Sequence, residues 1–371
     1  MVPIIRRPFR VLSLDETGSR PPSPTGQLFL WCPSPHTQAK IVAYLHAAGV
    51  EYAVAQGDCV IVNLEWDAMR DLVIPIRRIL THRESEDVRA LYKPVGGDLT
   101  TADIPKVQSY TAFSLVSQSA WLSEMLAQER FTSVLQPIVY ASDPTRVFAR
   151  EALLRGVGKD DAIVYPNYIF DLARGCGMLV QVEMAARQAA IDRMVLDDID
   201  ETLFLNLTPS IIDDPFASLE RTVAIIDEAK IAHDRVVFEV VESDQSHDVN
   251  HLKGLLRFYR DAGFRVALDD VGAGYSSLNL LHQLRPDFVK LDMDLIRGVH
   301  ADTYKALIAE KIIEIATALG VETIAEGVET AQELEWVQGH GATYAQGFGI
   351  ARPTVPTLSG RTPQSAERMV S

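Results

Sequence analysis

The chain has 371 residues, a length that suits one large barrel together with a smaller domain. Its formal net charge of −15 at pH 7 argues against a broad DNA-binding surface, because such surfaces carry clustered Lys and Arg. Cys32, Cys59 and Cys176 lie far apart without a CxxC pair, so we expect a reduced, cytoplasmic protein. No apolar run approaches the roughly 18 residues of a membrane span, so we expect no direct membrane insertion.

The N-terminal part of the chain predicts a small α/β domain behind a flexible leader. Residues 1–26 are rich in Pro, Ser, Arg and Gly, which is typical of a mobile segment. Residues 27–106 form the predicted domain, with strands at 28–31, 51–55 and 59–64, a turn at 56–58, helices at 35–48 and within 66–90, and a boundary near 93–98. Its composition leaves two roles open: a packing or dimerisation module, or a regulatory input domain that binds a protein partner.

Residues 107–353 alternate between helix and strand patterns, which favours a (β/α)₈ barrel over an open sheet. After a helix near 107–128, strands are predicted at 134–139, 147–154, 202–207, 236–241, 266–271, 288–292, 322–326 and 343–347. Helices are predicted at 168–175, 182–195, 219–230, 252–262, 278–283, 306–319 and 331–338. The predicted fold class is therefore α/β, a TIM-like barrel preceded by the small domain. Residues 354–371 are again rich in Pro and Ser and form a peripheral tail.

Polar side chains stand near the end of almost every predicted strand of the barrel. They are Glu151, Asn206, Glu239, Asp269 with Asp270, Lys290, Glu326 and Gln346. The carboxyl ends of barrel strands converge on one face, where active sites are built, so residues far apart in sequence would meet in one pocket. Ordinary solvated charges would explain any single member of this set, but they do not explain the whole set.

Apart from Lys290, the set consists of carboxylate and amide oxygens, which favour Mg²⁺, Mn²⁺ or Ca²⁺ over zinc or copper. One Mg²⁺ seldom takes so many protein ligands, because it keeps several waters, so two ions that share a carboxylate fit better. Such a pair would activate water and stabilise both oxygens of an in-line phosphoryl displacement. Asp269 and Asp270 would serve both ions, because the turn at 272–274 frees the backbone from strict alternation.

Lys290 is a positive charge in an otherwise apolar strand, which is a costly placement unless the lysine is paired. Beside the ions it would orient or deprotonate the attacking water, with its own pKa lowered by the cations. Lys290 is therefore a candidate catalytic residue.

A series of short motifs runs across residues 131–353. One of them is Glu151-Ala152-Leu153-Leu154-Arg155, which alone would be a trivial match and gains its weight from the others. The others are Gln136-Pro137-Ile138-Val139, Asn206-Leu207-Thr208-Pro209, FEVVES at 238–243, DDVGAGYSSL at 269–278, PDFVKLD at 286–292, AEGVET at 325–330, QGF at 346–348 and RP at 352–353. In order and spacing this series resembles the EAL domain family, which hydrolyses the bacterial second messenger cyclic di-GMP to linear pGpG. The family fold allows an antiparallel first strand in the barrel.

The resemblance implies two metal ions, Mg²⁺ or Mn²⁺, held by ligands on several strands. The first ion would take Glu151, Asn206, Glu239 and Asp269. Asp269 would also bridge to the second ion, which lies near Asp270. Ca²⁺ is expected to inhibit, because its larger and looser coordination sphere does not hold two ions at the short separation required.

The resemblance also assigns the residues around the ions. Glu326 and Gln346 would complete the metal site and act with Lys290 around the water. Glu242 matches the family glutamate that pins the loop after Asp270, and this loop also supports contacts in a homodimer through the barrel. Lys290, Glu326 and Glu242 are thus the implied catalytic residues. Positions that contact the dinucleotide are matched by Gln136, Leu153, Arg155, Glu329 and Phe348.

Two positions depart from the family pattern: Val271 stands where Phe is usual, and Phe348 stands where Tyr is common. Both keep apolar bulk. The leading interpretation is a metal-dependent phosphodiesterase that lowers the level of cyclic di-GMP, because the whole ligand set is present. Two alternatives stay open: a catalytically silent receptor that binds the dinucleotide, and an active barrel whose main output is a protein contact triggered by hydrolysis.

Overall fold

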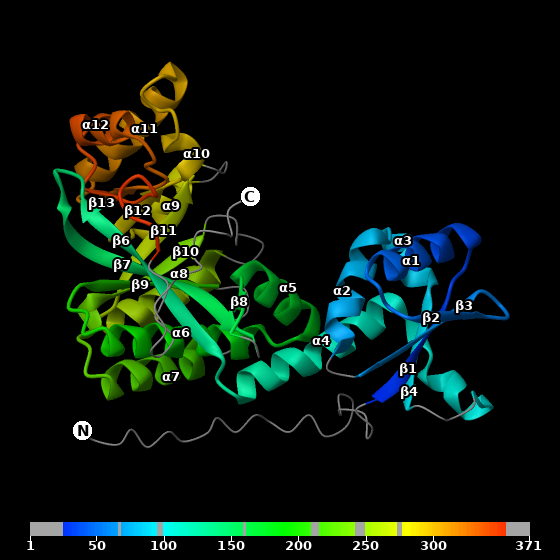
Figure 1. Ribbon diagram of the computed structural model, residues 1–371. Helices are drawn as coiled ribbons and strands as arrows, with labels where there is room; N and C mark the ends of the chain where they lie inside the picture. Colours follow the sequence, from blue (N-terminus) through cyan, green and yellow to red (C-terminus); the bar gives the residue numbers. More distant parts are fainter. Residues whose placement is uncertain are drawn as a thin grey trace. The chain divides into compact units, whose positions relative to one another are not determined.

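The computed structural model describes residues 25–65, 68–94, 99–158, 161–208, 215–241, 249–272 and 277–353. The chain divides into two compact units (Figure 1). One comprises Met1–Arg130 with Asn167–Met178, and the other comprises Phe131–Pro166 with Leu179–Ser371. The predicted tail at 354–371 and the predicted leader as far as residue 24 lie outside the described residues.

The N-terminal unit is built on a five-stranded sheet in the order β2-β3-β1-β4-β5. Its strands are β1 (Thr25–Trp31), β2 (Tyr52–Ala55), β3 (Cys59–Glu65), β4 (Arg89–Pro94) and β5 (Gln108–Ser109). Its helices are α1 (Pro35–Ala47), α2 (Met69–Ile79), α3 (His82–Asp87), the 3₁₀ helix η2 (Thr101–Lys106), α4 (Tyr110–Ala127) and α5 (Pro166–Cys176). All strand pairs are antiparallel, so β1 to β4 with their connecting helices form a ferredoxin-like arrangement.

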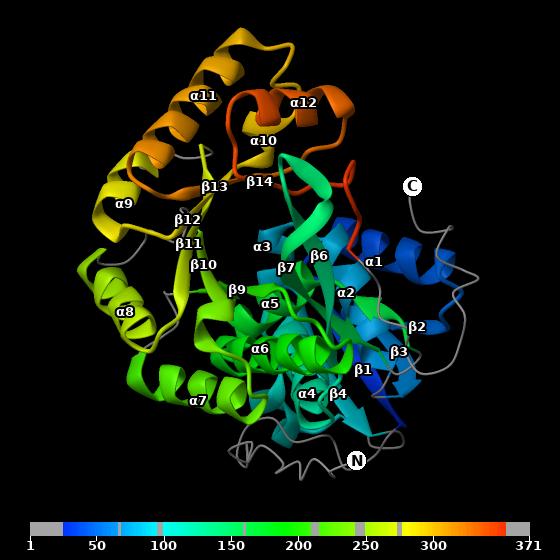
Figure 2. The ribbon, with the colours of Figure 1, turned by 90° about the vertical axis from the view of Figure 1, so that its left-hand side faces the viewer.

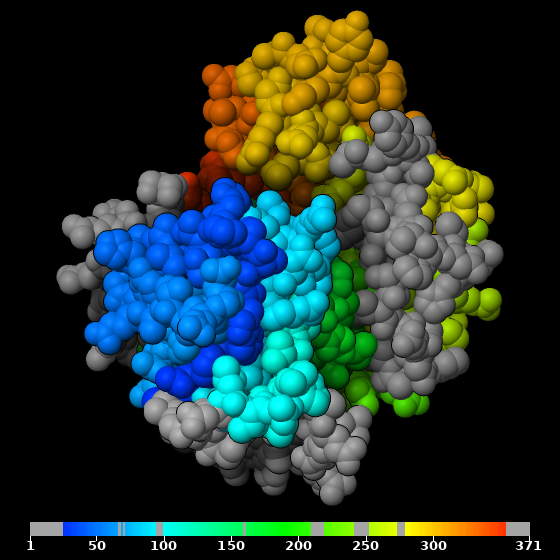
Figure 3. Space-filling view, turned by 90° about the vertical axis from the view of Figure 1, so that its right-hand side faces the viewer, coloured from blue at the N-terminus to red at the C-terminus, as the bar shows by residue number. Residues whose placement is uncertain are grey.

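The small α/β domain predicted from the sequence is confirmed, with two strands, β4 and β5, that the prediction missed. Gly57 and Asp58 join β2 to β3 and have φ angles of 75° and 54°, the left-handed conformation that tight hairpins require. The prediction of helix as far as Ala90 is wrong, because the chain from Arg89 onward forms β4 and pairs with β1. Figure 3 shows the described residues of this unit, coloured blue to cyan, as a continuous block of packed atoms.

The second unit is a closed barrel. Its strands are β6 (Phe131–Tyr140), β7 (Asp143–Val157), β9 (Thr202–Leu207), β10 (Val236–Val241), β11 (Arg265–Val271), β12 (Phe288–Leu291), β13 (Glu322–Ala325) and β14 (Tyr344–Ala345). They pair in the order β6-β14-β13-β12-β11-β10-β9-β7, and β6 pairs with β7 to close the ring. The strands from β7 to β14 are parallel, whereas β6 is antiparallel to both of its neighbours. The short strand β8 (Ile163–Val164) extends the sheet beside β7. The TIM-like barrel and its antiparallel first strand are confirmed.

Helices cover the outside of the barrel strands. They are α6 (Leu179–Leu196), α7 (Pro215–Glu228), α8 (Val249–Asp261), α9 (Ser277–Leu284), α10 (Met293–Ile296), α11 (Thr303–Ala318) and α12 (Ala331–Gly339), with the 3₁₀ helix η4 (His233–Arg235). Figure 2 shows α7, α8, α9 and α11 along the outer side of the strands. Outward-facing residues such as Leu205, Phe238 and Val289 join the core beneath the helices. No helix in the described ranges is long and apolar enough to cross a bilayer.

Inside the barrel, one buried layer receives a single apolar residue from each of the eight strands. This apolar layer consists of Ile138, Ala149, Phe204, Val237, Ala267, Phe288, Ile324 and Tyr344. The rings of Phe204 and Phe288 meet at a steep angle, with centroids 5.3 Å apart. Side chains alternate along a strand with a period of two, so the next inward residue toward the carboxyl end of each parallel strand lies above this layer. On the antiparallel β6 the equivalent residue comes two positions earlier.

Candidate active site

Two residues beyond the apolar layer, every strand of the barrel carries a polar side chain. This polar layer consists of Gln136, Glu151, Asn206, Glu239, Asp269, Lys290, Glu326 and Gln346. The strand pairing holds its members in register: Gln136 lies opposite Glu151 across β6 and β7, and Asn206 lies opposite Glu239 across β9 and β10. The fold therefore brings the predicted strand-end residues to one face of the barrel.

Lys290 lies among the carboxylates of the polar layer and is 1% exposed. Its Nζ forms ion pairs at 2.7 Å with Glu326, 2.8 Å with Glu239, 3.3 Å with Asp269 and 3.7 Å with Glu151. Burial by itself would lower the pKa of Lys290, but these carboxylates together raise it well above its ordinary value. The sequence predicted that bound cations lower the pKa of Lys290. In this metal-free arrangement the shift has the opposite sign, because the nearby carboxylates dominate.

Glu239 and Gln346 are buried, and Glu326 is partly exposed; each has either a displaced pKa or an oxygen without a hydrogen bond. Burial raises the pKa of Glu239 well above its ordinary value and that of Glu326 to about 8, and attraction to Lys290 offsets this only in part. Neither oxygen of Glu239 makes a hydrogen bond of good geometry, although Oε1 is within ion-pair distance of Lys290. Gln346 Nε2 donates to Glu151 Oε2 at 2.8 Å, while its own buried Oε1 has no hydrogen bond. Unfilled buried oxygens of this kind suit a cation.

Asp269 and Asp270 share one pocket because β11 bends where they lie. The pairing of β11 with β12 shifts register between Leu268 and Val271, and Asp270 has a φ of 56°. Carboxylate oxygens of Asp269, Asp270 and Glu326 consequently lie within 4.8 Å of one another. Burial, and then repulsion from Asp269, raise the pKa of Asp270 to about 6. The backbone irregularity expected from the following glycines is therefore present at these two residues.

Asp292 is an acidic residue that the sequence analysis left without a role. It directly follows β12 and is 9% exposed, and its Oδ1 accepts a hydrogen bond from Asp294 N at 2.8 Å, which caps α10. Its charge contributes to the raised pKa of Asp270. Its position two residues after Lys290 could have indicated this placement, because residues two apart in a strand face the same side. The predicted catalytic residue Glu242 lies outside the described residues.

The predicted contacts to the dinucleotide on β6 and β7 lie beside the polar layer. Gln136 is buried, whereas Leu153 and Arg155 are partly exposed. Arg155 Nη1 donates to Leu154 O at 2.7 Å, and its guanidinium lies 5.6 Å from the centre of the Tyr165 ring. Burial lowers the pKa of Arg155, and it remains a cation suited to a phosphate.

The other two predicted contacts lie on the loops that follow β13 and β14. Glu329 is exposed and forms an ion pair with Arg297 from the loop after β12. The Phe348 ring is 51% exposed, and the Arg352 guanidinium lies 5.0 Å from its centre. The rim residues Glu329 and Phe348 are thus open to solvent and to a ligand, whereas the polar layer is buried except for the exposed Asn206 and the partly exposed Glu326.

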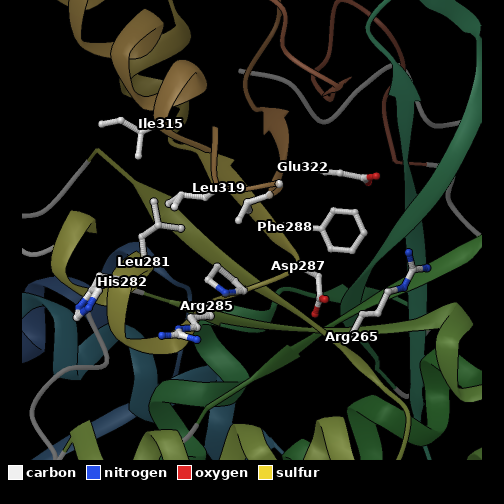
Figure 4. Close-up of a pocket in the computed structure, with 12 residues that line it drawn as sticks. Arg265, Leu281, His282, Arg285, Asp287, Phe288, Ile315, Leu319 and Glu322 are labelled. Carbon is white, nitrogen blue, oxygen red and sulfur yellow. The ribbon is translucent and has the colours of Figure 1, made fainter. Parts of the chain in front are cut away.

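A cavity of about 800 Å³ lies at the opposite end of the strands (Figure 4). Arg265, Phe288 and Glu322 line it, and they begin β11, β12 and β13, respectively. Leu281 of α9 and Ile315 of α11 form part of its apolar wall. Within the described ranges, no predicted site residue lines this cavity, so it is separate from the polar layer.

Similarity to known proteins agrees with this geometry. The "Probable cyclic di-GMP phosphodiesterase PdeN" of Escherichia coli (strain K12) is 26% identical over 235 residues, which cover 62% of this chain and 44% of that protein. The chain spans less than half the length of the curated relatives it matches.

Solved structures resemble the barrel more completely. The structure "PaMucR Phosphodiesterase, c-di-GMP complex" is 27% identical with a TM-score of 0.55, over 62% of this chain and 95% of that chain. A standalone EAL protein from Vibrio cholerae O395 in its c-di-GMP-bound form is 30% identical with a TM-score of 0.53, over 59% of this chain and 90% of that chain. The family model for the EAL domain matches residues 119–353. The chain belongs to the EAL domain family.

Proposed function

We propose that this protein hydrolyses cyclic di-GMP to linear pGpG and thereby lowers the level of that messenger. The observation that carries the proposal is the complete polar layer, with one polar side chain from each strand and Lys290 among its carboxylates. PdeN is named for this activity, and two similar structures were solved with cyclic di-GMP bound, which supports the substrate class.

The polar layer fits two divalent cations, which we propose to be Mg²⁺ or Mn²⁺. Its donors are carboxylate and amide oxygens, and those of Glu239 and Gln346 include buried atoms without a hydrogen bond. When bound, the ions supply positive charge that activates water and stabilises the reacting phosphate oxygens. The proposed ligands of the first ion are Glu151, Asn206, Glu239 and Asp269; those of the second are Asp269, Asp270, Glu326 and Gln346.

Lys290 is the residue proposed to orient the attacking water. Its ammonium is fixed by Glu239 and Glu326, and it points into the layer that the scissile phosphate would face. In the metal-free protein the surrounding carboxylates raise the pKa of Lys290 well above its ordinary value, so the ammonium is a hydrogen-bond donor there. Glu242, which lies outside the described residues, keeps its predicted role of pinning the loop after Asp270.

The rim residues are proposed to hold the dinucleotide. The Arg155 guanidinium suits a phosphate, because its planar fork makes paired charge-assisted hydrogen bonds. The exposed Phe348 ring offers a surface on which a guanine can stack. Glu329 offers an acceptor for the donors of a guanine edge, with Gln136 and Leu153 lining the space toward the polar layer.

We further propose a homodimer through the barrel, with the N-terminal unit as a regulatory module. Exposed apolar residues follow one side of α11 and its end: Tyr304 is 81% exposed and Leu319 is 61% exposed, with Leu307, Ile308 and Ile315 between them. An apolar row of this kind on an outer helix is typical of a surface that a partner covers. Sedimentation of the purified chain, compared with a Leu307→Lys variant, tests the dimer.

The decisive test of the activity uses the purified full chain with cyclic di-GMP and Mg²⁺ or Mn²⁺, with the products separated by chromatography. We expect pGpG to appear with either ion, and Ca²⁺ to support binding without turnover. Tight binding without any product in Mn²⁺ would instead place the protein among the silent receptors.

A further inference from the structure

Glu333 is a buried carboxylate that lies outside the polar layer and that the proposed reaction does not use. It stands in the first turn of α12, and it is 4% exposed. Buried carboxylates are costly unless hydrogen bonds satisfy them, so its partners indicate what it is for.

Both oxygens of Glu333 accept hydrogen bonds from backbone amides of two separate loops. Oε1 accepts from Gly298 N at 2.8 Å, and Oε2 accepts from Glu329 N at 2.8 Å and Thr330 N at 2.9 Å. Burial alone would raise the pKa of Glu333, but these amides lower it below its ordinary value. The carboxylate is thus ionised, and its two oxygens join the segment at Gly298 to the segment at Glu329 and Thr330.

A helix cap alone does not require this bridge. The bonds between Thr330 and Glu333 form a capping box, which needs one carboxylate contact to the N-cap amide. The capping box at the start of α3 is of this simple kind: Glu84 accepts from Thr81 N and pairs with a lysine side chain. Glu333 adds Gly298, which follows α10 in the connection between β12 and α11; this connection is called the loop after β12 below.

The two bridged loops lie next to residues of the proposed site, and the loop after β13 carries Glu329. The loop after β12 follows Lys290 and contains Arg297, which pairs with Glu329 of the loop after β13. The two connections also touch at Gly327, where a Cβ would come within 2.4 Å of Cβ of Met293, the first residue of α10. A change in their separation would therefore move Glu329 relative to the polar layer.

We propose that Glu333 is a positioning residue that locks the loop after β12 to the loop after β13 and so fixes Glu329 at the substrate rim. The proposal rests on the proposed function, because it assigns Glu329 a place against cyclic di-GMP. Glu333 acts through backbone amides and does not touch the substrate.

The test compares Glu333→Gln with Thr330→Ala in the full chain. In Glu333→Gln one carboxylate oxygen becomes an NH₂ group. This donor would face a backbone N–H of one of the two loops, and the hydrogen bond there would be lost. Thr330→Ala removes the cap side chain but leaves the three bonds to Glu333 intact. Glu335→Gln is a further control, since Glu335 lies on the same helix and is exposed.

We expect Glu333→Gln to raise KM for cyclic di-GMP about tenfold, with kcat changed less than about threefold, because one bridge of charged hydrogen bonds is lost. Thr330→Ala should lower the melting temperature without this rise in KM. Equal effects of the two variants on KM, or no effect of either, would overturn the proposal.

Two readouts separate failure of this proposal from failure of the proposed function. The proposed function fails if the wild-type chain binds cyclic di-GMP in Ca²⁺ but shows no turnover in Mn²⁺. In that case the variants are compared by their Kd for cyclic di-GMP instead of by KM. Hydrogen exchange of the Gly298 amide needs no ligand. Exchange faster than in the wild type in Glu333→Gln, but not in Thr330→Ala, supports the bridge, and equal exchange in both variants contradicts it.

Discussion

The apolar layer and the polar layer of the barrel are built on the same eight strands, two residues apart, and they contribute in opposite ways. The apolar layer buries aromatic and aliphatic side chains and stabilises the closed ring. The polar layer gathers four carboxylates around one lysine, where desolvation is costly and pKa values are displaced. The barrel therefore gains its stability at one level and holds its charged groups at the next.

The largest expected effect comes from removing one charge from the polar layer. Glu151→Ala should reduce turnover of cyclic di-GMP to background, because a proposed metal ligand is lost at a site that needs both ions. The dinucleotide should still bind measurably through Arg155 and the rim. Product formation and calorimetric binding measure the two effects, with the exposed Glu220→Ala on α7 as the control. Near-normal turnover would remove Glu151 from the ligand set.

The second expected effect concerns the single cation of the polar layer. Lys290→Ala should lower kcat about 10²–10⁴-fold with little change in KM, because the lysine acts on the water more than on the bound phosphate. The variant should also bind Mn²⁺ more tightly, since four carboxylates lose their internal counter-ion. Steady-state kinetics and calorimetry measure these changes. A normal kcat with a raised KM would make Lys290 a binding residue.

The third prediction probes the apolar layer. Phe204→Ala should lower the free energy of unfolding by about 3–5 kcal/mol, because it leaves a cavity among fully buried rings. Phe348→Ala should cost less than about 1 kcal/mol, because that ring is half exposed. Urea denaturation of the metal-free proteins measures both values. Similar losses in the free energy of unfolding at the two positions would mean that the apolar layer does not stabilise the barrel more than the rim does.

The smallest effect is a pH dependence of the metal-free protein. Burial raises the pKa of Glu326 from 4.5 to about 8, so the folded protein keeps a proton that the unfolded chain releases. The contribution of Glu326 to stability therefore falls as the pH rises from about 4.5 to about 8. Glu326→Gln cannot ionise and should lose this part of the slope in a series of melting temperatures. Parallel slopes for the two proteins would contradict the assignment.

Much of the barrel and its site could be predicted because the signals are local. In the strand Val236–Val241 every residue but one is apolar. The one acid, Glu239, must face the interior if its apolar neighbours face the helices. The partners of Lys290 could not be predicted as distances, because they depend on four other strands. Glu333 could not be predicted for the same reason, because one of its hydrogen-bond donors is the Gly298 amide, 35 residues away.

The N-terminal unit shows where local signals fail. The segment Arg89–Pro94 is short, and its apolar residues continue a helical pattern from the preceding residues. Only pairing with β1, more than fifty residues earlier, makes it a strand. The role of this unit as a regulatory module stays a prediction, as does the boundary drawn near residue 106.

The left-handed backbone of Asp270 sets a limit on how this site can change. At a φ of 56° Gly, Asn and Asp are favoured over other residues, and Asp is the one of these that is charged. Most other substitutions at position 270 should therefore cost about 1–2 kcal/mol in backbone strain. An Asp270→Asn variant would keep the backbone and lose the charge. A single nucleotide change thus separates a barrel with its full set of acids from a barrel that lacks one, and it offers a short route from the proposed enzyme to a receptor.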